Sequence, residues 1–120
     1  MAADELYALV PGWRALRPAE RRRLAQALEV VDVAAGEVAA PAGVAGVWRT
    51  LVVLGTVATT CPPRQFVAGD VLAHGRSTAL VAVTDCRLLT VDARHELAAA
   101  LGPVSYGADV RPALGQSVRA

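Results

Sequence analysis

The feature that most constrains this chain is the regular division of residues 30–92 into short β-rich segments by glycine and proline. The segments are VVDVAAGEVAAPAG, VWRTLVVLGTVATT, PRQFVAGDVLA and STALVAVTDCRLLTVD. Turn signals recur about every 8–12 residues, which is the rhythm of an antiparallel roll, barrel or sandwich. The sequence therefore predicts a mainly β fold.

One segment, VWRTLVVLGTVAT, carries apolar residues at both alternations of a strand. They are Trp48, Val52 and Leu54 on one alternation and Val47, Leu51 and Val53 on the other. Such a strand is buried on both faces over part of its length. The core that we predict for the whole domain consists of Leu24, Leu28, Val52, Leu54, Leu80, Val81, Leu88 and Val91.

Helical periodicity occurs near the two ends of the β region. Residues 16–31 have Pro18 where a first helical turn accepts it and Glu20 near the positive end of the helix dipole. Their apolar residues at helical spacing are Leu24, Ala27, Leu28 and Val31. We expect a helix of about three turns that stops before the β-branched run at residues 30–33. Residues 93–101 form a second helical pattern that ends at Gly102-Pro103. The predicted fold class is thus mainly β with flanking helices.

The charge balance excludes several classes of partner. A net charge of +1 gives no general field that would attract nucleic acid or an anionic membrane. The run Arg21, Arg22, Arg23 allows a nucleic-acid hypothesis, but a solvated helix face is favoured because no aromatic or second basic cluster joins it. The most apolar stretch, TLVVLGTVA, is far shorter than the roughly 20 residues that span a bilayer. The N-terminus lacks the basic start of a signal peptide, so we expect a cytoplasmic protein.

Metal binding and catalysis are also disfavoured. Cys61, His74, Cys86 and His95 do not form the close pairs that structural zinc sites use, so we expect no metal and interpret Cys86 as a small core residue. Ser77 has no His and Asp arrangement of recognisable spacing, and His74 is expected in a loop. We therefore expect no enzyme and no cofactor.

The order and spacing of several motifs resemble the cyclic nucleotide-binding domain of the catabolite-activator and kinase-regulatory-subunit superfamily. The resemblance covers about residues 6–101. The motifs that carry it are Gly36-Glu37, the turn 41–46, Leu54-Gly55-Thr56-Val57, Gly69-Asp70, Arg76-Ser77-Thr78 and Thr84-Asp85-Cys86. It implies a β-roll or jelly-roll-like domain over residues 1–101, followed by a tail over 102–120.

The resemblance also implies a ligand cassette that opens at Gly69 and Asp70. At its end Arg76 would bind the phosphate of a cyclic nucleotide or of another phosphate-bearing small molecule. The residues expected to assist it with hydroxyls and backbone amides are Gly75, Ser77 and Thr78.

The cassette departs from the family pattern. In the family, a short helix and a Phe-Gly-Glu, whose glutamate holds the ribose hydroxyl, stand between the Gly-Asp pair and the arginine. Here only residues 71–75 fill that gap. A site that keeps one charged contact and loses the others binds more weakly, since each charged hydrogen bond is worth about 1.5–3 kcal/mol. We expect cyclic nucleotide binding to be weak or lost.

Two functions remain open. The first is a stand-alone regulatory module that senses a small ligand, and the second is an interaction or scaffold subunit that binds none. Because residues 102–120 are too few for a DNA-binding domain, we expect another protein to carry the output in either case.

The tail contains a candidate docking segment. Its apolar residues at four-residue intervals are Tyr106, Val110, Leu114 and Val118. They fit either a frayed terminus or a segment that docks on a larger partner or on a second copy of the chain.

Overall fold

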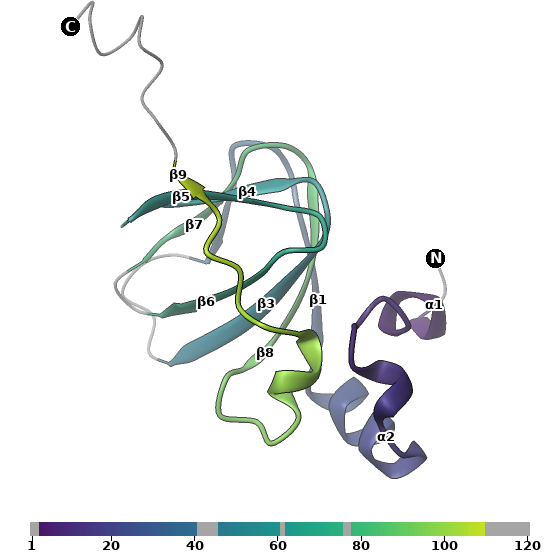
Figure 1. Cartoon of the computed structure of the whole chain (residues 1–120). Helices are drawn as coiled ribbons and strands as arrows, with labels where there is room; N and C mark the ends of the chain where they lie inside the picture. Colours follow the sequence, from purple (N-terminus) through teal and green to yellow (C-terminus); the bar gives the residue numbers. More distant parts are fainter. Residues whose placement is uncertain (1–2, 41–45, 61, 76–77, 110–120) are drawn as a thin grey trace, which may run out of the picture.

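A computed structural model describes residues 3–40, 46–60, 62–75 and 78–109 (Figure 1). Its strands form two antiparallel sheets. The first sheet has the order β1 (Glu29–Val33), β8 (Cys86–Asp92), β3 (Val47–Leu54), β6 (Val71–Gly75). The second has the order β2 (Val38–Ala40), β7 (Leu80–Ala82), β4 (Thr56–Thr60), β5 (Pro63–Val67), β9 (Ala108–Asp109). The predicted mainly β fold is confirmed.

The two sheets share an apolar core. Its buried members come from seven strands of both sheets: Val33, Val52, Val57, Phe66, Leu72, Leu80, Ala82, Cys86 and Leu88. Val52, Leu80 and Leu88 were predicted core positions, and Cys86 is buried as the sequence indicated. This core forms the inner layer of the roll.

A second core covers the opposite face of the first sheet. There the helical segments α1 (Ala3–Tyr7), η1 (Trp13–Ala15), α2 (Pro18–Ala27) and η2 (Ala98–Leu101) pack their apolar residues on the strands. Figure 1 shows α1 and α2 beside one end of β1, away from β5 and β9. The first sheet is therefore buried on both faces, and in β3 three consecutive residues, 50–52, are buried as predicted.

Two predicted core residues lie elsewhere. The Leu54 side chain is 55% exposed, because the register between β3 and β8 shifts after Val52 and the strand ends there. Val81 is half-buried, since β7 turns its neighbours Leu80 and Ala82 toward the core. Successive side chains of a strand point to opposite faces of the sheet, so Val81 cannot face the core when the residues on either side of it do.

Helix α2 begins as predicted and ends before the β-branched run at residues 30–33, as the sequence indicated. Pro18 occupies its first turn, and the Glu20 carboxylate accepts a hydrogen bond from the Arg17 backbone N–H at 2.9 Å. The helix ends at Ala27, and Val31, whose spacing fitted the helical pattern, lies in β1. Pairing of β1 with β8 from Glu29 onward takes the chain out of the helix.

The second expected helix is shorter than the pattern suggested. Only Ala98–Leu101 is helical, as a 3-10 turn. The Asp92 carboxylate accepts from the Arg94 N–H, and His95 Nδ1 accepts from the Leu97 N–H. Such side-chain bonds to nearby backbone compete with an α-helix. Leu97 and Leu101 nevertheless pack in the core as they would on a helix, since both are buried.

Beyond Leu101 the chain stays in contact with the roll as far as it is described. The Ser105 N–H donates to the Val71 carbonyl, and β9 pairs with β5. Tyr106 is 85% exposed, whereas Val110, Leu114 and Val118 lie outside the described residues. Within the described chain, no helix is long and apolar enough to cross a membrane.

Candidate functional site

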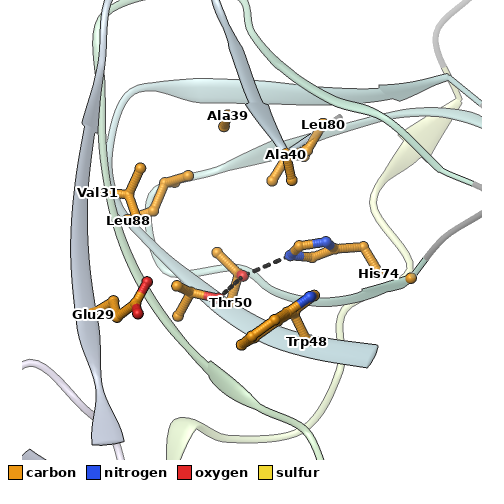
Figure 2. Close-up of a pocket in the computed structure, with 11 residues that line it drawn as sticks. Glu29, Val31, Ala39, Ala40, Trp48, Thr50, His74, Leu80 and Leu88 are labelled. Atoms are coloured by element: carbon orange, nitrogen blue, oxygen red, sulfur yellow. Dashed lines mark hydrogen bonds between the residues drawn. The ribbon is translucent and has the colours of Figure 1, made fainter. Parts of the chain in front are cut away.

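A cavity of about 200 Å³ lies between the two sheets (Figure 2). Six strands contribute to its wall, four from the first sheet and two from the second. The described residues that line it are Glu29, Val31, Ala39, Ala40, Trp48, Thr50, His74, Gly75, Leu80, Leu88 and Thr90. Figure 2 shows His74, Trp48 and the apolar side chains arranged around a common space.

Strand register brings the polar residues together. Thr50 of β3 pairs with Thr90 of β8, which in turn pairs with Glu29 of β1. Trp48 pairs with His74 of β6. Residues opposite each other on neighbouring antiparallel strands share one face of a sheet. The polar groups therefore form two adjacent rows on the inner face.

Hydrogen bonds link three of these side chains. Thr50 Oγ1 lies 2.8 Å from His74 Nε2 and donates to Thr90 Oγ1 at 2.9 Å. A hydroxyl has one proton, so Thr50 accepts the bond from a protonated Nε2. This leaves Nδ1 of the neutral ring as an acceptor, and among the described residues nothing donates to it.

His74 is neutral near pH 7 because it is buried. The side chain is 8% exposed, and desolvation lowers its pKa below the usual 6.5. The ionised group in the described lining is the Glu29 carboxylate, and no described cation faces it across the cavity. The electrostatic character of the described wall is thus neutral to negative.

The structure divides the sequence-predicted site residues into three groups. Gly75 lines the cavity, and the Thr78 N–H donates to the Gly75 carbonyl at 3.1 Å. Arg76 and Ser77 lie outside the described residues, between these two. Gly69 and Asp70 form the turn that opens β6, where the Asp70 carboxylate accepts from the Val67 N–H. That turn does not line the cavity.

The five residues between the Gly69-Asp70 turn and Arg76 form a strand. Residues 71–75 form β6 and pair with β3 over their whole length, so no helix stands between Asp70 and residue 76. The expectation that the family's helix has no room is confirmed.

Sequence reasoning missed the polar wall of the cavity. We had expected His74 in a loop, but it lies in β6 and is buried. The alternation of Leu72 and His74 on one side of VLAHG indicates an inward histidine. Thr50 and Trp48 share the corresponding alternation in their own strand. No local pattern indicates that Glu29 and Thr90 lie beside them, since this depends on pairing between distant strands.

Comparison with known proteins gives similarity at the level of structure. No protein-family model matches the sequence, and no curated protein matches it. The regulatory subunit of a cAMP-independent protein kinase A from Trypanosoma cruzi bound to guanosine is 24% identical, with a TM-score of 0.58. That match covers 84% of this chain and 42% of the other.

Two further structures are similar. The regulatory domain of Toxoplasma gondii protein kinase A with cAMP is 19% identical over 83% of this chain and 44% of the other, with a TM-score of 0.58. A Geobacter metallireducens protein named for cyclic nucleotide binding is 14% identical over 77% of this chain and 76% of its own, with a TM-score of 0.61. This chain therefore spans less than half of the two kinase chains. The similarity establishes the fold: the chain has the β-roll fold of cyclic nucleotide-binding domains.

Proposed function

We propose that the protein is a regulatory binding module, rather than an enzyme, that acts through a partner protein and in which cyclic nucleotide binding is weak or lost. The observation that carries this proposal is the direct passage of β6 from Asp70 to Gly75. Between Asp70 and Gly75 the described chain has no helix N-terminus to steady a phosphate and no carboxylate for a ribose hydroxyl.

The cavity is small for a nucleotide. Pockets that enclose a drug-sized ligand measure about 300–1,000 Å³. The cavity between the sheets measures about 200 Å³. A cyclic nucleotide would need the walls to move apart, and that displacement would reduce its affinity.

The charge of the described wall also opposes an anion. Glu29 repels a phosphate, and neutral His74 offers it no compensating charge. Arg76 is the cation that we propose for phosphate binding, assisted by Ser77 and Thr78. A single charged contact, worth about 1.5–3 kcal/mol, supports only modest affinity.

The structural neighbours are compatible both with weak binding of a cyclic nucleotide and with loss of that binding. The Toxoplasma gondii domain was solved with cAMP, whereas the Trypanosoma cruzi subunit belongs to a cAMP-independent kinase and holds guanosine. Structures with this fold have therefore been solved with a ligand that carries a phosphate and with one that carries none.

Calorimetric titration with cyclic AMP, cyclic GMP and inorganic phosphate tests the proposal. We expect dissociation constants no lower than about 0.1 mM for the intact protein, and still weaker binding for Arg76→Ala. Arg22→Ala, at an exposed position of α2, serves as the matched control. Micromolar binding of a cyclic nucleotide would overturn the proposal. Binding that Arg76→Ala leaves unchanged would show that the cassette is assigned wrongly.

The partner contact that we propose begins at Tyr106 and continues through Val110, Leu114 and Val118. Tyr106 presents a large aromatic ring to solvent two residues before β9 begins, and aromatic anchors of this kind dominate many interfaces. If no ligand binds at all, the same contact would serve a scaffold subunit.

Removal of residues 110–120 tests the partner contact, because it leaves β9 and its pairing with β5 in place. We expect the shortened protein to melt at nearly the same temperature and to lose a partner in pull-down from its native cells. Tyr106→Ser should weaken the same interaction. Recovery of identical partners by both variants and by the full chain would refute the docking segment.

A further inference from the structure

Strand β6 is an edge of the first sheet, and part of that edge is free. Val71 points its backbone N–H and carbonyl away from β3, since they bond to Ser105 Oγ at 3.2 Å and to the Ser105 N–H at 2.6 Å. Backbone groups of a strand alternate in direction, so those of Ala73 point the same way as those of Val71. Ala73 is exposed, and no described group bonds to its N–H or its carbonyl. An extended segment can therefore pair with β6 at Ala73.

Arg49 lies on the outer face of the sheet beside this free edge. It pairs in register with Ala73, so the two side chains share that face. Its Nη1 donates to the Gly102 carbonyl over 3.4 Å, which is longer than a usual bond, and Gly102 lies next to Val71. The guanidinium is thus directed toward β6, where the residue opposite Arg49 has only a methyl side chain.

The charge of Arg49 has no counterpart within the described chain. Arg49 is half-buried, and none of the ion pairs between described residues includes it. Its Nε is a buried side-chain atom that lacks a hydrogen-bond partner there. Burial has removed part of the water that solvates a cation, so a carboxylate is favoured beside it. Arg22 on α2 is exposed and solvated by water, and it needs no such partner.

From these observations we infer that the free edge of β6 binds an extended, acidic segment of the partner protein, which adds a strand to the first sheet. The backbone of that segment bonds to the Ala73 N–H and carbonyl, and a carboxylate opposite Ala73 pairs with Arg49. Residues opposite each other on paired strands share a face, so this carboxylate lies on the Arg49 side of the sheet. The inference rests on the proposed function, because it names the kind of segment that the partner contributes.

The distances and the neighbouring surface fit this arrangement. The added residue and Arg49 lie two strands apart, about 10 Å between Cα atoms, which extended arginine and glutamate side chains span together. The chain already pairs an extended stretch with this edge, where Ser105 bonds to Val71 (Figure 1). Tyr106, 85% exposed, follows Ser105, so the free edge is continuous with the docking surface proposed above.

A second copy of the chain fits this edge less well than an acidic segment. Antiparallel pairing of two β6 strands about a two-fold axis perpendicular to the sheet would place both Arg49 side chains on one face. Like charges on one face repel each other, and β6 itself, Val71–Gly75, carries no carboxylate to offset them. The charge of Arg49 therefore favours a different, acidic partner.

Two peptides that differ in one side chain test the inference on the unmodified full chain. The probes are Thr-Val-Glu-Val-Thr and Thr-Val-Gln-Val-Thr with blocked ends, titrated to about millimolar concentration into ¹⁵N-labelled protein. We expect the acidic peptide to shift the amide signals of Ala73 and Gly75, and to bind at least about tenfold more tightly than the neutral peptide. The Ala73 amide should also exchange more slowly with deuterium when the acidic peptide is bound.

A substitution at Arg49 isolates the contribution of charge. Arg49→Gln should weaken binding of the acidic peptide by about tenfold, so that the two peptides bind alike. Arg22→Gln, at an exposed position of α2, serves as the matched control and should leave both affinities unchanged.

Substitutions at Ala73 isolate the backbone pairing and the missing carboxylate. Ala73→Pro removes an N–H that points away from β3, so the protein should remain folded and lose both peptides. Ala73→Asp places a carboxylate directly opposite Arg49 within the chain. It should melt at a higher temperature than Ala73→Asn and bind the acidic peptide at least about tenfold more weakly than the unmodified protein. If Ala73→Pro fails to fold, the comparison of Ala73→Asp with Ala73→Asn decides.

The outcomes separate this inference from the proposed function. If neither peptide shifts the Ala73 signal, or if both bind equally well, the inference is refuted, while calorimetry with cyclic nucleotides still decides the proposed function. Micromolar binding of cyclic AMP would overturn the proposed function whatever the peptides do. Self-association in analytical ultracentrifugation that Ala73→Pro abolishes would assign the edge to a second copy and refute the acidic partner. Equal melting temperatures of Ala73→Asp and Ala73→Asn would refute the need of Arg49 for a carboxylate.

Discussion

At the scale of single residues, Gly36 and Gly55 have the same backbone conformation and different surroundings. Both have φ of 85°, a region that side chains with a Cβ rarely adopt. A Cβ on Gly36 would meet nothing within 4 Å, whereas one on Gly55 would overlap the Asp85 carbonyl and lie 2.9 Å from Cys86 Sγ. The turn between β3 and β4 therefore requires glycine at position 55 for two reasons, the positive φ and the close packing around it.

This pair of glycines gives a matched stability prediction. Gly36→Ala should lower the free energy of unfolding by about 1 kcal/mol, the cost of the conformation alone. Gly55→Ala should cost at least about 2 kcal/mol more, because backbone must move to admit the methyl group. Urea denaturation of both variants measures the difference. Equal losses would show that the turn relaxes freely around Gly55.

His74 also makes stability depend on pH. Its pKa in the folded protein lies below 6.5 because burial disfavours the charged ring, so above pH 6.5 both folded and unfolded states are neutral and stability is complete. As the pH falls below 6.5, the unfolded chain binds a proton that the folded state refuses. The free energy of unfolding should fall until the pH reaches the lowered pKa, and then level off.

Urea denaturation at pH 7.5 and at pH 5.5 measures this dependence. The loss at the lower pH should shrink in His74→Gln and persist in His95→Gln. Asp92 affects stability over a different pH range. Hydrogen bonds from the Arg94 side chain and backbone lower the pKa of its carboxyl group from 3.8 to about 2. Its contribution to the free energy of unfolding is therefore lost only as the pH falls through that range. An unchanged pH dependence in His74→Gln would contradict the assignment to His74.

At the scale of elements, an apolar contact and an ion pair of different strength connect α2 to the rest of the domain. Leu24 is fully buried in the outer core, whereas the Arg23–Glu96 ion pair, at 2.8 Å, joins side chains that are 49% and 63% exposed. Burial of apolar area in a packed core outweighs an exposed ion pair, which contributes about 0–1 kcal/mol.

Two substitutions on α2 test this ranking. Leu24→Ala should destabilise the protein by about 2–5 kcal/mol through the cavity that it leaves. Arg23→Ala, one residue away on the same helix, should cost less than about 1 kcal/mol. Thermal and urea denaturation provide the measurement. A larger loss for Arg23→Ala than for Leu24→Ala would reverse the account of how the helix is held.

The same elements show how far local sequence patterns predict structure. Pro18 and Glu20 identified the start of α2, because helix starts depend on nearby residues. The β-branched run at residues 30–33 likewise indicated where it ends. The exposure of Leu54 depends on strand pairing with β8, a segment more than thirty positions away along the chain. The helix expected at 93–101 was shortened by side-chain bonds around Asp92 and His95, which periodicity does not reveal.

At the scale of the whole molecule, β3 lies between the cavity on one face of the first sheet and the helical segments on the other. Thr50 faces the cavity, and its neighbour Leu51 packs in the core beneath the helical segments. The cavity wall and the helix layer thus share one strand. A ligand that moves β3 would act on both, which is the arrangement that a regulatory module needs.

The candidate site was only partly predictable at this scale. The sequence motifs identified the roll and the lack of room for a helix between Asp70 and Gly75, and Gly75 lines the cavity. The chemistry of the wall depends on Glu29, Thr50, His74 and Thr90, which four different strands contribute. Their proximity is a property of sheet register, and no motif within one strand encodes it.

The central claim is that this roll has weakened or lost its affinity for cyclic nucleotides, and the free energy of unfolding tests it most directly. A ligand that binds only the folded state stabilises it by RT ln(1 + [L]/Kd), whatever its binding enthalpy. With about 1 mM cyclic AMP, a Kd of about 0.1 mM or weaker predicts a gain of at most about 1.4 kcal/mol. A gain near 4 kcal/mol, as a Kd of about 1 μM requires, would contradict the account.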